Sequence, residues 1–132
     1  MTPLLYLDLN DAHRMTESSI KAAQEMKISV SVCVLDPAGH VICLARMDGA
    51  SFQTPAVAKG KALTSAMMKK ASGIIETATL ERLSFTSFND GRLPIQGGLP
   101  VFSGDPPVGS LGISGGTPFQ DETIAKVGDN AF

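Results

Sequence analysis

Small and apolar residues in the first quarter of the chain recur at helical spacing. The positions that repeat at three- and four-residue intervals are Leu9, Ala12, Met15, Ser19, Ile20, Ala23 and Met26. Asp8 comes directly before them, and an aspartate there can accept a hydrogen bond from the free amides of a first helical turn. We therefore expect a helix over residues 9–27.

The pattern then changes to alternation, with branched side chains at even positions from Ile28 to Val34. Residues 36–39, Asp-Pro-Ala-Gly, have turn chemistry, so a β-hairpin is predicted here. If Leu35 pairs with Val41 across the turn, one face of the hairpin carries bulky side chains and the other carries small ones. The other pairs that this register predicts are Val34 with Ile42, Val32 with Leu44, Cys33 with Cys43, and Ser31 with Ala45. We expect the two cysteines to pack side by side rather than to carry out redox chemistry.

A second helix is predicted over residues 54–70, where Thr54 and Pro55 form an N-cap and first-turn pair. Gly60 lies inside this helix, and a glycine there costs about 1 kcal/mol relative to alanine. Its presence indicates close backbone contact with another element. A further helical segment is expected near residues 74–83.

Residues 91–116 differ in composition from the rest of the chain, because they hold eight of its 13 glycines and four of its 8 prolines. Within them, "GLPVF" and "PVGSLGIS" are predicted to be strands joined by a turn at residues 103–106. Thr117 and Gln120 then form a capping box, and a final helix is expected to reach about Gly128.

Composition indicates one domain over residues 1–132, because 132 residues with 43% hydrophobic content suffice for a single core. The net charge of -2 has no basic block, which argues against nucleic acid as a partner. No segment has the roughly 20 apolar residues that a membrane span needs, and no signal-peptide pattern is present. We expect a cytoplasmic protein with no membrane partner.

Two cysteines without a Cys-x-x-Cys or Cys/His cluster indicate neither a disulfide framework nor a metal site. The chain is rich in aliphatic residues but has only seven aromatic ones, six Phe and one Tyr. A small domain of this kind has apolar surface left over, and subunit contacts are one way to cover it. We therefore expect a homo-oligomer.

The stretch Gly112–Gly116 fits the G-x-S-x-G pattern of a hydrolase nucleophile elbow at Ser114. In that fold the catalytic acid and histidine follow the serine, whereas His13 and His40 both precede it. The elbow interpretation is therefore rejected.

What remains at this stretch is a strand that leads through Gly115 and Gly116 into a capped helix. Its amides could bind a carboxylate or another anion. Alternatively, the glycines only permit a tight turn, and Thr117 and Gln120 satisfy the amides internally. The sequence leaves both interpretations open.

Two cations and one histidine are further candidates. Arg46 at a strand end and Lys61 inside a helix are expected near the apolar core, where a charge needs a partner or an anionic ligand. His13 lies on the polar flank of the first helix and could ligate haem iron if that flank lined a pocket. The other possible axial ligands are His40, Tyr6, the methionines and the cysteines.

Four segments in this order resemble the GlcG/HbpS family, which includes the C-terminal domain of PduO-type proteins. They are "VLDPAGHVICLARMDGA", "VAKGKALTSA", "LPIQGGLPVF" and "VGSLGISGGTPFQDETIAKVG", and the likeness extends from the first helix to Gly128. The resemblance implies a single profilin-like α/β (α+β) domain with an antiparallel sheet of about five strands flanked by helices. It also implies homo-oligomers from dimers to octamers. Some members bind haem and the family is often called haem-degrading, while others belong to glycolate or diol utilisation clusters.

The resemblance also implies a set of ligand-binding residues that line one concavity between the glycine-rich loops and the lysine-bearing helix. These are Arg46, Lys61, Gly97, Gly98, Ser114, Gly115, Gly116 and Thr117. His13 lies in the helix where a haem ligand of the family could be placed.

Two functions remain open from the sequence. The first is an oligomeric binding protein for haem, another tetrapyrrole or a small anionic metabolite. The second is a small enzyme that acts on a carboxylated or hydroxylated metabolite and uses Lys61 or Arg46 to hold the anion. The sequence has no histidine-based catalytic dyad and no metal-ligand set, which favours binding.

Overall fold

The computed structural model describes all residues 1–132 and shows an α+β domain built on one antiparallel sheet. Its elements are α1 (Leu9–Glu25), β1 (Ser31–Leu35), β2 (Val41–Arg46), α2 (Thr54–Met68), α3 (Ser72–Thr79), the 3-10 helix η1 (Leu83–Thr86), β3 (Gly98–Phe102), β4 (Pro107–Ser114) and α4 (Pro118–Asn130). The strand order is β2-β1-β4-β3. The sheet has four strands, close to the expected five, and the fold class is confirmed.

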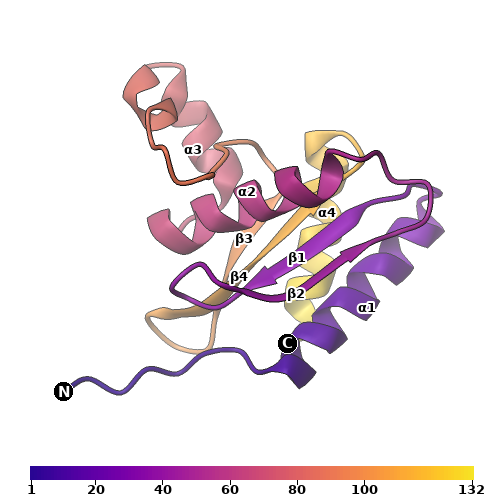
Figure 1. Cartoon of the computed structure of the whole chain (residues 1–132), viewed down its shortest axis with the longest axis horizontal. Helices are drawn as coiled ribbons and strands as arrows, with labels where there is room; N and C mark the ends of the chain where they lie inside the picture. Colours follow the sequence, from indigo (N-terminus) through magenta and orange to yellow (C-terminus); the bar gives the residue numbers. More distant parts are fainter.

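The elements form three layers (Figure 1). Helix α2 packs on one face of the sheet, whereas α1 and α4 pack together on the other face. Helix α3 and η1 extend away from these layers, next to the end of α2. No helix of the protein has the length and apolar character needed to cross a membrane.

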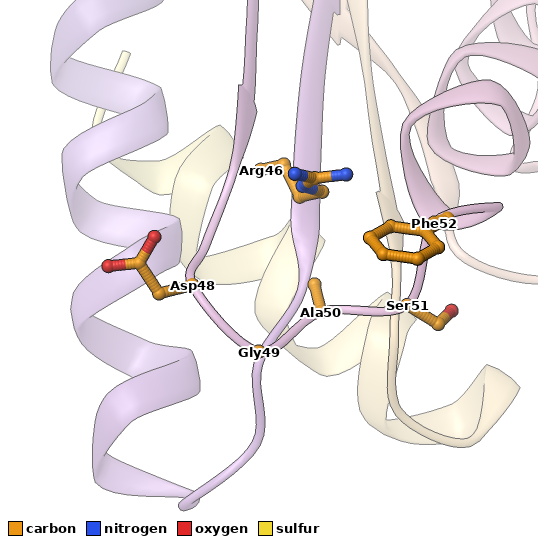
Figure 2. A pocket seen from close by; sticks show the side chains of 6 residues that line it. All are labelled: Arg46, Asp48, Gly49, Ala50, Ser51 and Phe52. Atoms are coloured by element: carbon orange, nitrogen blue, oxygen red, sulfur yellow. The ribbon is translucent and has the colours of Figure 1, made fainter.

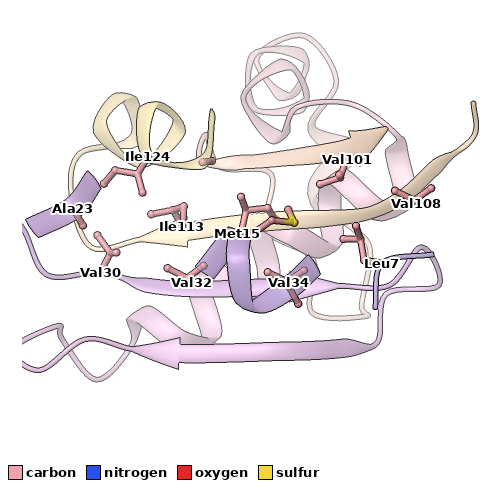
Figure 3. Close-up of a cluster of buried hydrophobic side chains, with 13 residues drawn as sticks. Leu7, Met15, Ala23, Val30, Val32, Val34, Val101, Val108, Ile113 and Ile124 are labelled. Atoms are coloured by element: carbon pink, nitrogen blue, oxygen red, sulfur yellow. The ribbon is translucent and has the colours of Figure 1, made fainter. Parts of the chain in front are cut away.

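The main core lies between the sheet and the α1–α4 layer (Figure 3). Alternation places Val32 and Val34 of β1 on this face, as the sequence predicts, together with Val30 just before the strand, and they meet Met15 of α1 and Ile124 of α4. The opposite face of β1 contributes to a smaller cluster, which consists of Cys33, Leu35, Ala58 and Ala62. The two faces therefore differ in size, and α2 lies against the face with small side chains.

The predicted hairpin register is wrong beyond its first pair. Leu35 does pair with Val41, but a β-bulge follows, so that Val34 pairs with Cys43 and Cys33 with Leu44. The bulge adds one residue to β2 and shifts every later pair by one position. Cys33 consequently faces α2, whereas Cys43 faces α1 and accepts a hydrogen bond from the Thr16 hydroxyl at 3.6 Å. The two thiols do not lie side by side.

Cys33 is expected to be chemically inert in the folded protein. Burial raises the pKa of its thiol to about 12, so almost no thiolate is present at pH 8. Mass spectrometry after iodoacetamide treatment at pH 8 should find Cys33 unmodified in buffer and alkylated in denaturing urea. Alkylation of Cys33 under native conditions would show that this face of the sheet opens.

Helix α2 approaches the sheet at glycine positions. A Cβ atom on Gly112 would lie 2.1 Å from the Ala58 carbonyl oxygen, and one on Gly98 would lie 2.3 Å from the Lys61 carbonyl oxygen. Gly98 and Gly112 are partners in neighbouring strands, so together they form a flat site under α2. The contact predicted at Gly60 is confirmed, because its carbonyl accepts a hydrogen bond from the Leu93 amide at 2.9 Å.

Most helix boundaries follow local signals. The predicted capping box is present at α4, and Asp8 caps α1 as predicted, with Asp11 completing a second capping box there. Thr54 differs from the prediction, because its hydroxyl does not cap α2 but bonds to the Ser51 carbonyl at 2.7 Å and the Ser31 hydroxyl at 2.8 Å. The segment expected near residues 74–83 divides into α3 and η1.

Candidate functional site

Lys61 is buried and paired with a carboxylate. Its ammonium lies 2.8 Å from Asp121 Oδ2 and donates a second hydrogen bond to the Ile113 carbonyl at 2.9 Å. The side chains of Lys61 and Asp121 are 3% and 2% exposed. The partner that a charge at this position needs is thus supplied by the first turn of α4, and the ammonium does not reach the surface.

Of the glycines predicted to line a concavity, Gly97 and Gly98 lie against Lys61, and Gly116 bonds to Asp121. A Cβ on Gly97 would lie 2.9 Å from Lys61 Nζ, and one on Gly115 would lie 2.3 Å from the Ser29 carbonyl oxygen. Both have positive φ angles, +134° and +147°. The absence of a side chain at these glycines therefore makes space for Lys61 and for the protein's own backbone. It does not make space for a ligand.

The amides at the start of α4 are satisfied internally. Gly116 N–H donates to Asp121 Oδ1 at 2.8 Å, Thr117 N–H donates to Gln120 Oε1 at 2.9 Å, and Gln120 N–H donates to the Thr117 hydroxyl at 3.2 Å. Of the two interpretations left open by the sequence, this geometry matches the tight turn rather than an anion site. Ser114 is the last residue of β4 and is buried.

Arg46 lies apart from this cluster, in a surface groove (Figure 2). The Arg46–Phe52 groove has a volume of about 510 Å³ and is lined by Arg46, Asp48, Gly49, Ala50, Ser51 and Phe52. Its residues come from the end of β2 and the loop that leads to α2. The Arg46 guanidinium lies 5.4 Å from the centre of the Phe52 ring, and Phe52 is 89% exposed. Figure 2 shows Asp48 pointing to the opposite side, towards α1.

His13 and His40 are both exposed, and neither lines the groove. No three His, Cys, Asp or Glu side chains come together in a group that could hold a metal ion. The structure thus brings together Lys61 with the glycine loops, and leaves Arg46 and His13 at separate positions.

The sequence assigns no role to Phe52, and it places Asp121 among the family residues around the concavity without identifying it as the partner of Lys61. A signal for Phe52 exists, because a large aromatic residue between Ser51 and Gln53 in a polar loop has no helical or strand periodicity to bury it. The pairing of Asp121 with Lys61 gives no such signal, since the two residues lie 60 positions apart.

The family model and the similar sequences all point to one protein family. A family model described as "Haem degrading protein HbpS-like" matches residues 7–129. Protein GlcG of Escherichia coli K12 is 32% identical over 93 residues, which are 70% of this chain and 69% of GlcG. Corrinoid adenosyltransferase PduO of Salmonella typhimurium is 31% identical over 126 residues, which are 91% of this chain but only 37% of PduO.

Solved structures show the same fold. A double mutant of HbpS from Streptomyces reticuli has a TM-score of 0.96 and 26% identity, with 100% of this chain and 90% of that chain covered. A complex of PduOC with haem has a TM-score of 0.89 and 27% identity, with 97% of this chain and 96% of that chain covered. Together with the family match over residues 7–129, these similarities establish that the chain belongs to the HbpS-like family.

Proposed function

We propose that this protein binds a tetrapyrrole, with haem as the first candidate, in the Arg46–Phe52 groove. The observation that carries the proposal is the exposed Phe52 ring beside the Arg46 guanidinium. An aromatic ring placed next to a cation at a groove offers a ligand both a flat apolar contact and a positive charge.

The two side chains match two parts of a porphyrin. An aromatic ring attracts a flat macrocycle by stacking and by burial of apolar area. A guanidinium binds a carboxylate such as a propionate through two parallel hydrogen bonds. The solved complex of PduOC with haem supports haem as the candidate, because the folds agree over nearly the whole chain.

The ion pair at Lys61 argues against the alternative function, an enzyme that acts on a carboxylated metabolite. An enzyme that held a carboxylated substrate with Lys61 would need that ammonium to be accessible, but it is enclosed and paired with Asp121. Arg46 is the remaining cation for such a role. We therefore place ligand binding ahead of catalysis.

Truncation of either groove residue is expected to weaken hemin binding. Arg46→Ala removes a charge-assisted hydrogen bond of about 1.5 kcal/mol, so Kd should rise about tenfold. Phe52→Ala removes a stacking contact of about 1 kcal/mol, so Kd should rise about fivefold. Titrations of hemin followed by its Soret absorbance give both constants.

Matched controls come from exposed residues elsewhere. Arg82 lies beyond α3, and Phe102 ends β3 at the opposite edge of the sheet from β2. Arg82→Ala and Phe102→Ala should bind hemin like the unmodified protein. Absence of saturable hemin binding in the unmodified protein, or equal losses in groove and control variants, would contradict the proposal.

Assembly into homo-oligomers, from dimers up to octamers, is part of the same proposal, as is a cytoplasmic location. Apolar side chains on the α3–η1 extension support assembly, because Ile74, Leu80 and Leu83 are 57%, 83% and 77% exposed in the single chain. Such a surface is usually covered in the functional state of a protein.

A further inference from the structure

The Arg46–Phe52 groove contains no side chain of the kinds that hold haem iron. Proteins ligate this iron with histidine, cysteine, methionine or tyrosine. The groove is lined instead by one arginine, one aspartate, one serine, one phenylalanine and two small residues. The donor set therefore fits the organic part of a haem and does not fit its metal.

The histidines do not compensate for this lack. His40 precedes β2, and Arg46 ends it, so that six extended residues, about 20 Å, separate the two. His13 lies on α1, which packs on the face of the sheet opposite to α2, whereas the groove loop leads into α2. Neither imidazole faces the groove.

The sulfur atoms near the groove are engaged elsewhere. Met47 follows Arg46 directly, but its thioether accepts a hydrogen bond from the Val30 amide at 3.4 Å and packs against the main core. Cys33 is fully buried under α2, and Cys43 bonds to Thr16 on the α1 side. None of these sulfur atoms lines the groove.

We infer that the groove recognises the carboxylated macrocycle and not its metal, so that a metal-free porphyrin binds as tightly as haem. This inference rests on the proposed function. Affinity then comes from the Arg46–carboxylate contact and from the Phe52 ring, and both are present whether or not iron is bound.

Protoporphyrin IX and hemin are the two probes that test the inference. Each is titrated into the full chain in dilute detergent, and binding is followed by porphyrin absorbance for both and by porphyrin fluorescence for the metal-free compound. The two Kd values are expected to agree, Arg46→Ala should raise both about tenfold, and His13→Ala should change neither. Phe102→Ala serves as the control for general loss of structure.

A third probe isolates the carboxylate contact. The dimethyl ester of protoporphyrin IX keeps the ring but has no anionic oxygen, so it should bind the unmodified protein about tenfold more weakly than the free acid. The Arg46→Ala variant should bind acid and ester equally, because the partner of the carboxylate is absent. A preference for the acid that persists in Arg46→Ala would assign the contact to another residue and overturn this part of the inference.

The outcomes separate the two proposals. If hemin binds and protoporphyrin IX binds at least about tenfold more weakly, the metal is ligated and the inference is overturned, while the proposed function stands. A loss of hemin binding in His13→Ala would have the same meaning. If neither compound binds, the proposed function itself fails, and the inference fails with it.

Discussion

Replacement of Lys61 by methionine is expected to lower the free energy of unfolding by about 3–5 kcal/mol. The substitution keeps most of the side-chain volume but leaves the buried carboxylate of Asp121 without its counter-ion. A buried charge that loses its partner costs far more than the pair itself contributes. Urea denaturation followed by circular dichroism measures the loss, since a single domain of this size is expected to unfold in one transition.

Two further variants test the cause of this loss. Lys126→Met removes a lysine that is 66% exposed and 3.7 Å from Glu122, and it should cost no more than about 1 kcal/mol. The double variant Lys61→Met with Asp121→Leu should recover part of the stability, because no unpaired charge remains. Recovery should be incomplete, since the Gly116 amide loses its acceptor. A cost below about 1 kcal/mol for Lys61→Met alone would show that the pair is hydrated.

Substitution of Gly112 by alanine is expected to be about as damaging, with a loss of about 3 kcal/mol or more. The added methyl group would lie 2.1 Å from the Ala58 carbonyl oxygen and 2.7 Å from the Ala62 amide nitrogen, both of which are backbone atoms of α2. Neither atom can move without a shift of the whole helix. Urea denaturation followed by circular dichroism measures this loss too. The circular dichroism signal of the folded variant in buffer should also be weaker than that of the unmodified protein.

Gly73→Ala is the matched control for this substitution. A Cβ at Gly73 would lie 3.0 Å from Cγ of Gln96, which is a flexible side chain, and the position lies in α3. Alanine also favours a helix over glycine, so the free energy of unfolding should change by less than about 1 kcal/mol. Similar losses for Gly112→Ala and Gly73→Ala would contradict the close approach of α2 to the sheet.

Elements fixed by neighbouring residues were predictable from the sequence. The Thr117–Gln120 capping box and the strands Gly98–Phe102 and Pro107–Ser114 agree with the structure, because caps and turns depend on a few adjacent side chains. The need of Lys61 for a partner also followed from its place in the helix. The identity of that partner did not, because it depends on how α4 packs relative to α2.

Features that depend on tertiary contacts were missed. The bulge after Leu35 reverses the expected faces of later β2 residues, and no turn residue in the hairpin marks it. The Arg46–Phe52 groove contains Arg46 as a predicted ligand residue, but it lacks Lys61 and the glycine pairs. The family resemblance singles out these residues, but only the packing shows that Gly97 and Gly98 lie against Lys61 and that Gly116 bonds to its partner Asp121.

The Lys61–Asp121 pair has a topological consequence. It joins α2 to α4, which lie on opposite faces of the sheet, and it closes a loop between residues 60 positions apart. Unlike a covalent cross-link, the pair does not restrict the unfolded chain, so it acts on the folded state alone. Neither outer layer can leave the sheet without separating the two charges, so the two layers are held to open together as one cooperative unit.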